Sequence, residues 1–361
     1  MNPFLRKPYR DDREQRVAML RGGLHLFFRK TTQRMQRRFV RLADAKSMPR
    51  VFLHGNPHLD NYVRTKTGTA MVDFDRARHG PYGYDLVRLM VSLSIRARRP
   101  MGPLLTGPVR ASLRRGYLQG LLCPELGWEE MEHLRKVRAN RWYETTDAYL
   151  AAGRGWAKRL HAFRVEPETV RAQKLFERYC ANRSVEDWLD RYTVAQAAEV
   201  AGTMGKSHTL LLLRPRSETD DSVLLDFKET YTEKDNKWFR NPYGHQGERM
   251  RAAEALHTPG WNPLGAFVSD QGRDLWVREI ETYQVKIKRQ LREAELMEVA
   301  TSVGSQLGRA HGQSVQAGTR FDLAERFRRE YDDLIYVATT LLAEVTDAYR
   351  RYEDTATKIA A

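Results

Sequence analysis

The sequence predicts an α+β protein in which a helical half with a small hairpin precedes a β-rich segment and a helical tail. Apolar residues recur with a helical period of about 3.6 over residues 11–48 and 85–98. From about residue 194 the pattern changes to short apolar runs bounded by turn residues, which is typical of strands. A length of 361 residues exceeds one domain of ordinary size, so two domains or lobes are expected.

The first half is expected to place two short strands between helices. Residues 50–54 (Arg-Val-Phe-Leu-His) form a short apolar run, and residues 70–74 form another after a turn at Gly68. Prolines at 100, 103 and 108 then interrupt the chain, and residues 110–191 have mainly helical periodicity.

The second half is expected to be a meander of strands with one inserted helix over residues 247–257. The tail, residues 289–361, has the composition and period of helices. The expected strands are 194–201, 208–214, 222–230, 266–269 and 274–281, the last two joined at Gln271-Gly272.

Composition excludes several classes of protein. Apolar residues make up 41% and charged residues 30% of the chain, which excludes a wholly disordered protein. No apolar run approaches the ~18 residues of a membrane span, and no secretory signal is recognisable. Two distant cysteines, Cys123 and Cys180, exclude a disulfide framework and a zinc motif, so a cytoplasmic location is expected.

The chain is strongly basic, with 61 Lys and Arg against 46 Asp and Glu and a net charge of +15. Such a charge favours anionic partners such as nucleotides, phosphorylated metabolites or nucleic acids. The simpler interpretation is that these cations lie on solvated helix faces.

Three polar motifs lie close together in the first half. They are His54-Gly55-Asn56-Pro57-His58-Leu59-Asp60-Asn61, then Val72-Asp73-Phe74-Asp75, then Gly80-Pro81-Tyr82-Gly83-Tyr84-Asp85-Leu86. Mg²⁺ takes oxygen ligands from one or two side chains and from phosphate and water. Asn61 and Asp73 can supply such oxygens if the hairpin between them brings the two strand ends together.

These motifs resemble the catalytic core of the aminoglycoside-phosphotransferase and choline-kinase branch of the kinase-like enzymes. That branch carries His-Gly-Asp-x-x-x-x-Asn, a strand ending in Ile-Asp-Phe, and a Tyr-Asp-Leu. They resemble still more closely the bacterial family called domain of unknown function 2252. Its core reads Gly-Asp-Ala-His-Leu-x-Asn-Phe, Asn-Asp-Phe-Asp and Gly-Pro-x-x-x-Asp-x-x-Arg-Leu. The last motif corresponds here to Gly80-Pro81 and Asp85-Leu86-Val87-Arg88-Leu89.

The resemblance implies a kinase-like phosphotransferase that uses ATP and Mg²⁺ on a small-molecule acceptor. Asn61 and Asp73 would hold Mg²⁺, and His54 and Asp85 would brace the loop that precedes Asn61. One departure is Asn56, which stands where the family places the loop Asp that acts as base. An amide can accept a hydrogen bond but cannot take the proton.

Two nearby residues are alternative bases. His58 and Asp60 follow Asn56 by two and four residues. The simpler interpretation is that neither residue is a base: Asp60 would be solvated, and His58 would pack in the interior. We favour this interpretation for Asp60, whereas for His58 both interpretations remain open.

The nucleotide-binding part would come from the later β-rich segment, because the residues before His54 look helical. Gly202 and Gly205 lie between two expected strands, Lys228 ends the next one, and the following helix offers Glu248 or Glu254 as its partner. The catalytic lobe would thus precede the nucleotide lobe, which is a circular permutation of the kinase-like fold. The expected parts are a helical lobe (1–193), a smaller β-rich nucleotide lobe (194–289) and C-terminal helices that pack on the helical lobe (290–361).

The glycine loop is not a P-loop, since Val200 stands where the first glycine of G-x-x-x-x-G-K-[ST] is needed and a strand follows. Arg278-Glu279, Lys286 and His311 resemble later motifs of the same family, although a solvated strand edge and a structural histidine explain them as well.

Three other functions remain open at this point. They are a pseudokinase that binds nucleotide without chemistry, a nucleotidyl (AMP) transferase on the same fold, and a nucleic-acid binder that only the net charge supports. No motif identifies the acceptor or the oligomeric state.

Overall fold

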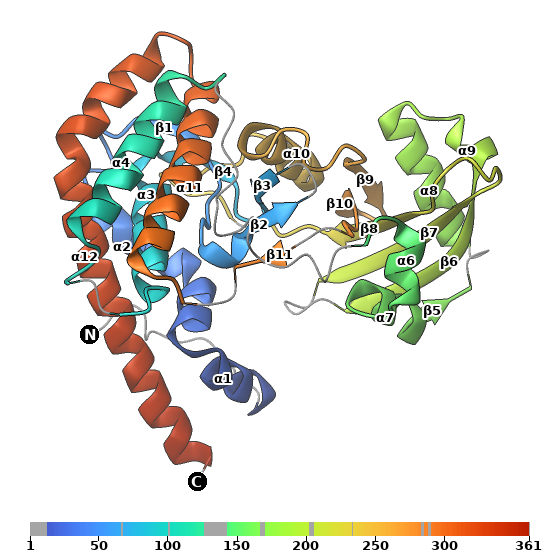
Figure 1. The fold of residues 1–361 in the computed structure, drawn as a ribbon, viewed down its shortest axis with the longest axis horizontal. Coiled ribbons are helices and arrows are strands. Elements are labelled where there is room, and N and C mark those ends of the chain that lie inside the picture. The colour runs from blue at the N-terminus through green and yellow to red at the C-terminus, as the bar shows by residue number, and fades with distance from the viewer. Residues whose placement is uncertain are drawn as a thin grey trace.

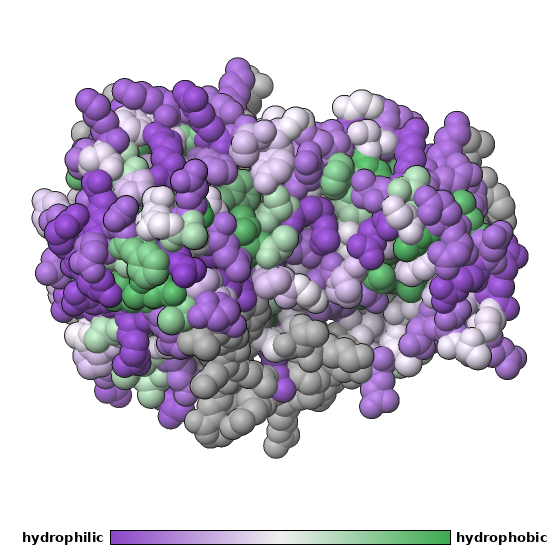
Figure 2. All heavy atoms as spheres, turned by 90° about the horizontal axis from the view of Figure 1, so that it is seen from above, coloured by the Kyte–Doolittle hydropathy of each residue, from purple (hydrophilic) through white to green (hydrophobic). Residues whose placement is uncertain are grey.

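The computed structural model describes residues 13–65, 68–99, 102–125, 143–166, 170–201, 206–232, 234–282, 285–287 and 290–360. The longest helices gather at one end of the molecule, and a six-stranded antiparallel sheet with further helices against it lies at the other (Figure 1). One more helix and two smaller sheets lie between these ends. The face seen in Figure 2 is mainly hydrophilic, with hydrophobic side chains in small patches. Among the described residues, no helix has the length and apolarity needed to cross a membrane.

The first helices are α1 (Arg13–Lys30) and α2 (Thr32–Leu42). The predicted helical stretch over 11–48 is interrupted at Thr31, whose hydroxyl donates to the carbonyl of Phe28 at 2.8 Å. The amphipathic pattern places Met35 and Phe39 of α2 in the core, where they meet the longer helices.

The polar motifs lie on two small sheets. β1 (Arg50–Leu53) pairs with β4 (Arg78–Pro81), and β2 (Tyr62–Thr65) lies between β3 (Gly68–Met71) and β11 (Val285–Lys286). The strand expected over 70–74 ends at Met71. Asp73 has a φ of +72°, which is the left-handed region and cannot continue a β-ladder.

The six-stranded sheet has the order β5-β6-β7-β8-β10-β9. Its central strands are rich in leucine and valine, as expected for a sheet covered on both faces. The strands are β5 (Arg164–Val165), β6 (Tyr192–Ala201), β7 (Ser207–Pro215), β8 (Val223–Glu229), β9 (Ala266–Asp270) and β10 (Arg273–Glu279).

Helices that precede the sheet in sequence cover it. Leu175 and Tyr179 of α8 pack against one face, and Ala157 and Leu160 of α7 pack against the other. The boundary expected at residue 193 is therefore wrong, because the packing changes near the start of α6. The helices concerned are α6 (Thr146–Ala151), α7 (Trp156–Ala162), α8 (Val170–Arg183) and α9 (Trp188–Arg191).

The helical core combines the first half of the chain with its tail. α3 (Gly83–Ile95) and α4 (Gly107–Leu122) pack with α11 (Glu293–Gln313) and α12 (Thr319–Ala360) around one apolar cluster. The tail thus packs on the first half of the chain.

The helix α10 (Gln246–His257) joins these parts. Its Met250 and Ala253 pack in one cluster with Val72 and Phe74 of the polar motif and with Trp276 of β10. The strand ends that carry Asp73 therefore have a fixed position relative to the six-stranded sheet.

Close contact between α4 and α11 depends on glycine. A Cβ on Gly120 would lie 1.9 Å from the carbonyl oxygen of Ser305, and one on Gly308 would lie 2.1 Å from that of Tyr117. Backbone atoms cannot move aside as a flexible side chain can, so these positions have no room for alanine.

We expect Gly120→Ala to lower the free energy of unfolding by about 1–3 kcal/mol, because overpacking outweighs the better helix propensity of alanine. Urea denaturation measures this change. Gly318→Ala is the matched control, since a Cβ there meets open space and should leave the midpoint nearly unchanged. A Gly120→Ala variant as stable as the control would contradict the packing described.

Candidate functional site

The loop from His54 to Asn61 is held in place by Asp85, which is fully buried in the first turn of α3. Its Oδ2 accepts from the backbone N–H of His54 at 2.7 Å, and its Oδ1 accepts from that of Gly55 at 3.0 Å. His311 of α11 lies 3.4 Å from Oδ2. Buried carboxylates need such partners, and the position in the first helical turn adds a favourable dipole.

His54 connects this loop to the strand end that carries Asp73. Its Nδ1 accepts from the N–H of Asn56 at 3.4 Å, and its Nε2 lies 3.2 Å from the carbonyl of Val72. The ring is thus neutral with its proton on Nε2, and burial lowers the pKa of His54 accordingly.

Two unusual backbone conformations shape the site. Gly55 has a φ of +79°, and a Cβ there would lie 1.9 Å from the carbonyl oxygen of Arg76, so only glycine fits. Asp73 adopts a left-handed conformation without being glycine, which costs of order 1 kcal/mol or more. This turn directs the Asp73 carboxylate out of the line of β3.

Asn61 and Asp73 lie on adjacent strand ends. The carbonyl of Asn61 accepts from the N–H of Val72 at 2.8 Å, directly beyond the β2–β3 ladder. The side chain of Asn61 is buried, and its Nδ2 donates to the carbonyl of Asn56 at 3.3 Å. The hairpin therefore brings together the two residues that the sequence singles out as metal ligands.

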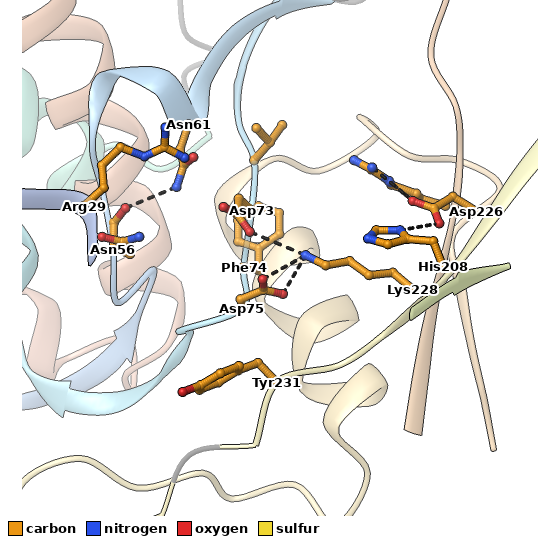
Figure 3. A network of polar contacts seen from close by, with 12 residues as sticks. Arg29, Asn56, Asn61, Asp73, Phe74, Asp75, His208, Asp226, Lys228 and Tyr231 are labelled. Atoms are coloured by element: carbon orange, nitrogen blue, oxygen red, sulfur yellow. Dashed lines mark hydrogen bonds and ion pairs between the residues drawn. The ribbon is translucent and has the colours of Figure 1, made fainter. Parts of the chain in front are cut away.

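Lys228, near the end of β8, reaches the same place from the six-stranded sheet (Figure 3). Its Nζ donates to both carboxylate oxygens of Asp75 at 2.8 Å and lies 3.6 Å from Oδ1 of Asp73. Burial alone would lower the pKa of Lys228, but the carboxylates of Asp75 and Asp73 more than offset this and raise it.

The expected pair between Lys228 and a glutamate of α10 does not form. The partners of Lys228 are Asp73 and Asp75, which reach its Nζ directly. Glu254 is instead buried beside Arg251, with a separation of 2.7 Å, and burial raises its pKa to about 7. Glu248, at the start of α10, is half-buried and does not contact Lys228.

The carboxylate of Asp73 is ionised. Burial raises its pKa, but the charges of Lys228 and Arg29 more than compensate, and the pKa lies below the ordinary value. Its side chain remains 37% exposed, so a ligand can reach it.

Asn56 is bound to a buried arginine. Its Oδ1 accepts from Nε of Arg88 at 2.6 Å and from the hydroxyl of Thr32 at 3.3 Å. Arg88 is fully buried, and its other partners are Met35, Thr32 and backbone carbonyls of α1. None of its partners among the described residues is a carboxylate. Because Oδ1 is occupied, the amide group available to a ligand is the Nδ2 donor.

The two alternative bases have other roles. Nε2 of His58 accepts from Nε of Arg29 at 3.2 Å, and burial lowers the pKa of His58 well below its usual range. Asp60, expected to be solvated, is paired: it lies 2.9 Å from Nη1 of Arg29 and 3.7 Å from Arg96. Neither side chain is available to remove a proton from a bound alcohol.

Arg249 of α10 is a residue that sequence reasoning missed. It is buried, and its guanidinium donates to the carbonyls of Phe74, Ala77 and Tyr231 at 2.7–3.2 Å. Arg249 therefore fixes the backbone just after Asp73. No local pattern marks it, because three of its acceptors are backbone carbonyls far away in sequence and the fourth is Gln246 of the same helix.

A second polar group lies on the same face of the sheet as Lys228. Asp226 is fully buried and contacts Nδ1 of His208 at 2.8 Å and Nη2 of Arg278 at 3.0 Å. Trp156 of α7 covers His208, with ring centroids 5.1 Å apart. Arg278 and its neighbour Glu279 pair in register with Asp226 and Leu225 of β8.

Two expected residues of the glycine loop, Gly202 and Gly205, lie outside the described residues. The backbone of Lys286 pairs with that of Val63 in the hairpin sheet. No group of three or more His, Cys, Asp or Glu side chains among the described residues could hold a metal ion. A metal ion at this site would take its protein ligands from Asn61 and Asp73 and its remaining ligands from the bound substrate.

The comparison with family models divides the chain in two. Residues 2–134, which contain all three polar motifs, match the model described as the phosphotransferase enzyme family (APH). The class of protein that this site resembles is therefore the kinase-like phosphotransferases. Residues 132–355 match the model described as "Uncharacterized protein conserved in bacteria (DUF2252)", which spans more than half of the chain. The protein belongs to this DUF2252 family. No curated protein and no solved structure matches the chain.

The contact between Asn56 and Arg88 predicts how stability changes when the aspartate of the family motif is restored at position 56. In Asn56→Asp the new carboxylate would face a guanidinium that is already buried, and its pKa would fall below the ordinary ~3.9. A carboxylate with a depressed pKa stabilises the fold above its unfolded pKa and loses this effect as pH falls through its folded pKa. We expect the variant to be more stable than the wild type by about 1–3 kcal/mol at pH 7, with the difference shrinking as pH falls below about 4 and lost only below the folded pKa.

Thermal unfolding between pH 3 and 8 measures this difference. Asn56→Ala is the opposite control, since it leaves Nε of Arg88 without this acceptor and should destabilise the protein at every pH. An Asn56→Asp variant less stable than the wild type at pH 7 would contradict the assignment.

Proposed function

We propose that the protein is a kinase-like phosphotransferase that moves a phosphoryl group from ATP, with Mg²⁺, to a small-molecule acceptor. The observation that carries this proposal is the meeting of Asp73 and Asn61 with Lys228. Two oxygen ligands lie on one braced hairpin, and a lysine from a separate sheet reaches one of them, Asp73. Phosphoryl transfer depends mainly on positioning and on charge stabilisation, and these residue types provide both.

The order of the parts supports a circularly permuted kinase-like fold. The N–H of Phe52 donates to the hydroxyl of Ser314, just beyond the end of α11, at 2.9 Å. The helix α11, which follows the six-stranded sheet in sequence, therefore ends beside the strand that runs into the loop at His54. In an unpermuted kinase-like chain the sheet would come before this loop, whereas here the loop comes first. In this proposal the nucleotide lobe begins near residue 146 and ends near 282, and the remaining residues form the helical lobe.

The residues present fit Mg²⁺. Asp73 is an ionised carboxylate with an exposed oxygen, and Asn61 offers an amide oxygen once its Nδ2 is bound to the Asn56 carbonyl. When bound between these residues and the phosphates, Mg²⁺ would neutralise charge on the phosphate oxygens.

The remaining roles belong to the side chains of this protein. Lys228 binds phosphate oxygens, exchanging its contact with Asp75 for them. Asp85 keeps the loop in place, and Nδ2 of Asn56 donates to the oxygen of the acceptor. The absence of a base at this position lowers the rate by the 10²–10⁴-fold that general bases typically contribute.

The second candidate is a pseudokinase, and the observation that favours it is the engagement of Asn56 with Arg88. Nucleotidyl transfer on the same site is the third. Incubation with ATP labelled at the γ- or the α-phosphate, over a panel of metabolites, separates all three. Label from the γ-position moves in a kinase, label from the α-position moves in a nucleotidyl transferase, and neither moves in a pseudokinase.

The role of Lys228 predicts weaker nucleotide binding in Lys228→Met. We expect the Kd for Mg·ATP to rise at least tenfold, because a charge-assisted contact to phosphate is lost. Isothermal titration calorimetry measures this Kd. The control is Lys174→Met on α8, an exposed lysine whose loss should leave the Kd unchanged. Equal Kd values in the two variants would refute the role of Lys228.

If Asp73 binds Mg²⁺, ATP binding by the Asp73→Asn variant should no longer depend on Mg²⁺. The wild type should bind ATP more tightly with Mg²⁺ than with EDTA, whereas the variant should bind ATP equally in both, since a neutral amide is a weaker ligand for a hard cation. Titrations with and without Mg²⁺ measure the difference. A variant that keeps the wild-type response to Mg²⁺ would exclude Asp73 as a ligand.

A further inference from the structure

A second cation lies beside Asp73, on the side away from Lys228. Arg29, in the last turn of α1, is drawn with Asn56 and Asn61 on one side of the strand end from Asp73 to Asp75, and Lys228 lies on the other (Figure 3). Its charge is one of those that lower the pKa of Asp73. Two cations from distant parts of the chain therefore flank one carboxylate.

The guanidinium of Arg29 is fixed by two hydrogen bonds and has a further nitrogen that can donate. Nε donates to His58 at 3.2 Å, and Nη1 donates to Asp60 at 2.9 Å. Nη2 has no acceptor among the described residues, and the side chain is 33% exposed. A planar guanidinium fixed by two of its nitrogens presents the third in a defined direction.

Two further arginines and two carboxylates lie near Arg29. Arg88 and Arg96 are the cations, and Asp60 and Asp73 are the acids, of which Asp60 pairs with Arg29 and Arg96. His25 and His58 add no charge, because burial lowers the pKa of His25 to about 4 and that of His58 well below its usual range. Nη2 of Arg29 can therefore donate to an anion at this point, beside Asp73.

We propose that Arg29 is a catalytic residue that binds the oxygens of the phosphoryl group while it is being transferred. This inference rests on the proposed function and deepens it. Lys228 binds the phosphates that remain with the nucleotide, and Arg29 binds the one that leaves it. Positive charge at this position compensates in part for Asn56, which cannot remove a proton.

The transfer balances without a base. A lone pair of the acceptor hydroxyl oxygen forms the new P–O bond, while the bond from the γ-phosphorus to the bridging oxygen breaks and leaves its electron pair on ADP. The hydroxyl proton passes to an oxygen of the transferred phosphoryl group, whose second pKa is near 6 once it is an ester. Arg29 lowers the barrier by stabilising the charge spread over the phosphoryl oxygens.

This assignment gives His58 and Asp60 a role as positioning residues. Both would act through Arg29, since His58 accepts from its Nε and Asp60, which also pairs with Arg96, accepts from its Nη1. The two residues that the sequence offers as bases would instead orient a cation.

Two measurements test Arg29, and each has a transition-state readout. The first is phosphate release from Mg·ATP, with water as acceptor, by the wild type, Arg29→Ala and Arg29→Lys. The second is the affinity for Mg·ADP with and without aluminium fluoride, which mimics the transferred phosphoryl group. Arg41→Ala is the matched control, since Arg41 is an exposed arginine at the end of α2.

We expect Arg29→Ala to lower the rate of phosphate release at least 100-fold while the Kd for Mg·ATP changes less than threefold. The gain in affinity on adding aluminium fluoride should disappear in Arg29→Ala and shrink in Arg29→Lys, because an ammonium cannot reproduce a planar fork of donors. Ethylguanidinium should restore part of the activity of Arg29→Ala. Arg41→Ala should behave as the wild type.

The inference is overturned if Arg29→Ala releases phosphate within threefold of the wild-type rate, or if it keeps the full aluminium fluoride effect. It is also overturned if Arg29→Lys, folded as judged by its melting temperature, loses Mg·ATP binding, since Arg29 would then be a ground-state binding residue. A wild type that binds Mg·ATP without releasing phosphate or phosphorylating any acceptor overturns the proposed function, and this inference with it.

Discussion

The site depends on one buried carboxylate. Asp85 accepts two consecutive backbone N–H groups, from His54 and Gly55, and thereby fixes the direction of the loop that carries Asn56 and Asn61. A fully buried carboxylate is costly unless its oxygens are satisfied, so loop and helix can pack together only in this arrangement. The contact of Asp85 with His311 extends the same constraint to α11, from the far end of the chain.

Buried arginines also hold the backbone around this loop. Arg88 binds Asn56 and the carbonyls that end α1, and Arg249 binds the carbonyls that follow Asp73. Burial lowers the pKa of each to about 10, so both remain charged at neutral pH. Lys228 and Arg29 add positive charge beside Asp73.

The substitution at position 56 has to be understood together with Arg88. In the family motif an aspartate at this point would meet the arginine of the following helix. Here an amide takes its place and still satisfies Nε through its oxygen. The geometry of the loop is thus retained, while the proton-accepting group is lost. An active site that relies on cations and a pseudokinase share this geometry, and turnover distinguishes them.

The sequence by itself determined the local elements and the hairpin site. Periodicity and turn residues located the strands from β6 to β10 and the helices α3 and α10 within a few residues, because burial of one face leaves a regular pattern. Motif spacing selected Asn61 and Asp73, since short-range geometry constrains neighbours along a hairpin, and the resemblance to kinase-like families added Asp85 and Lys228.

Only the tertiary structure decided the partners of these residues. Lys228 pairs with Asp75 rather than with Glu248, and residues 146–193 pack on the sheet rather than on the helical core, because long-range packing chooses among partners that the sequence offers equally. Arg29 and Arg249 have no local signature, since an arginine whose partners lie far away in sequence looks like any other arginine in this basic chain.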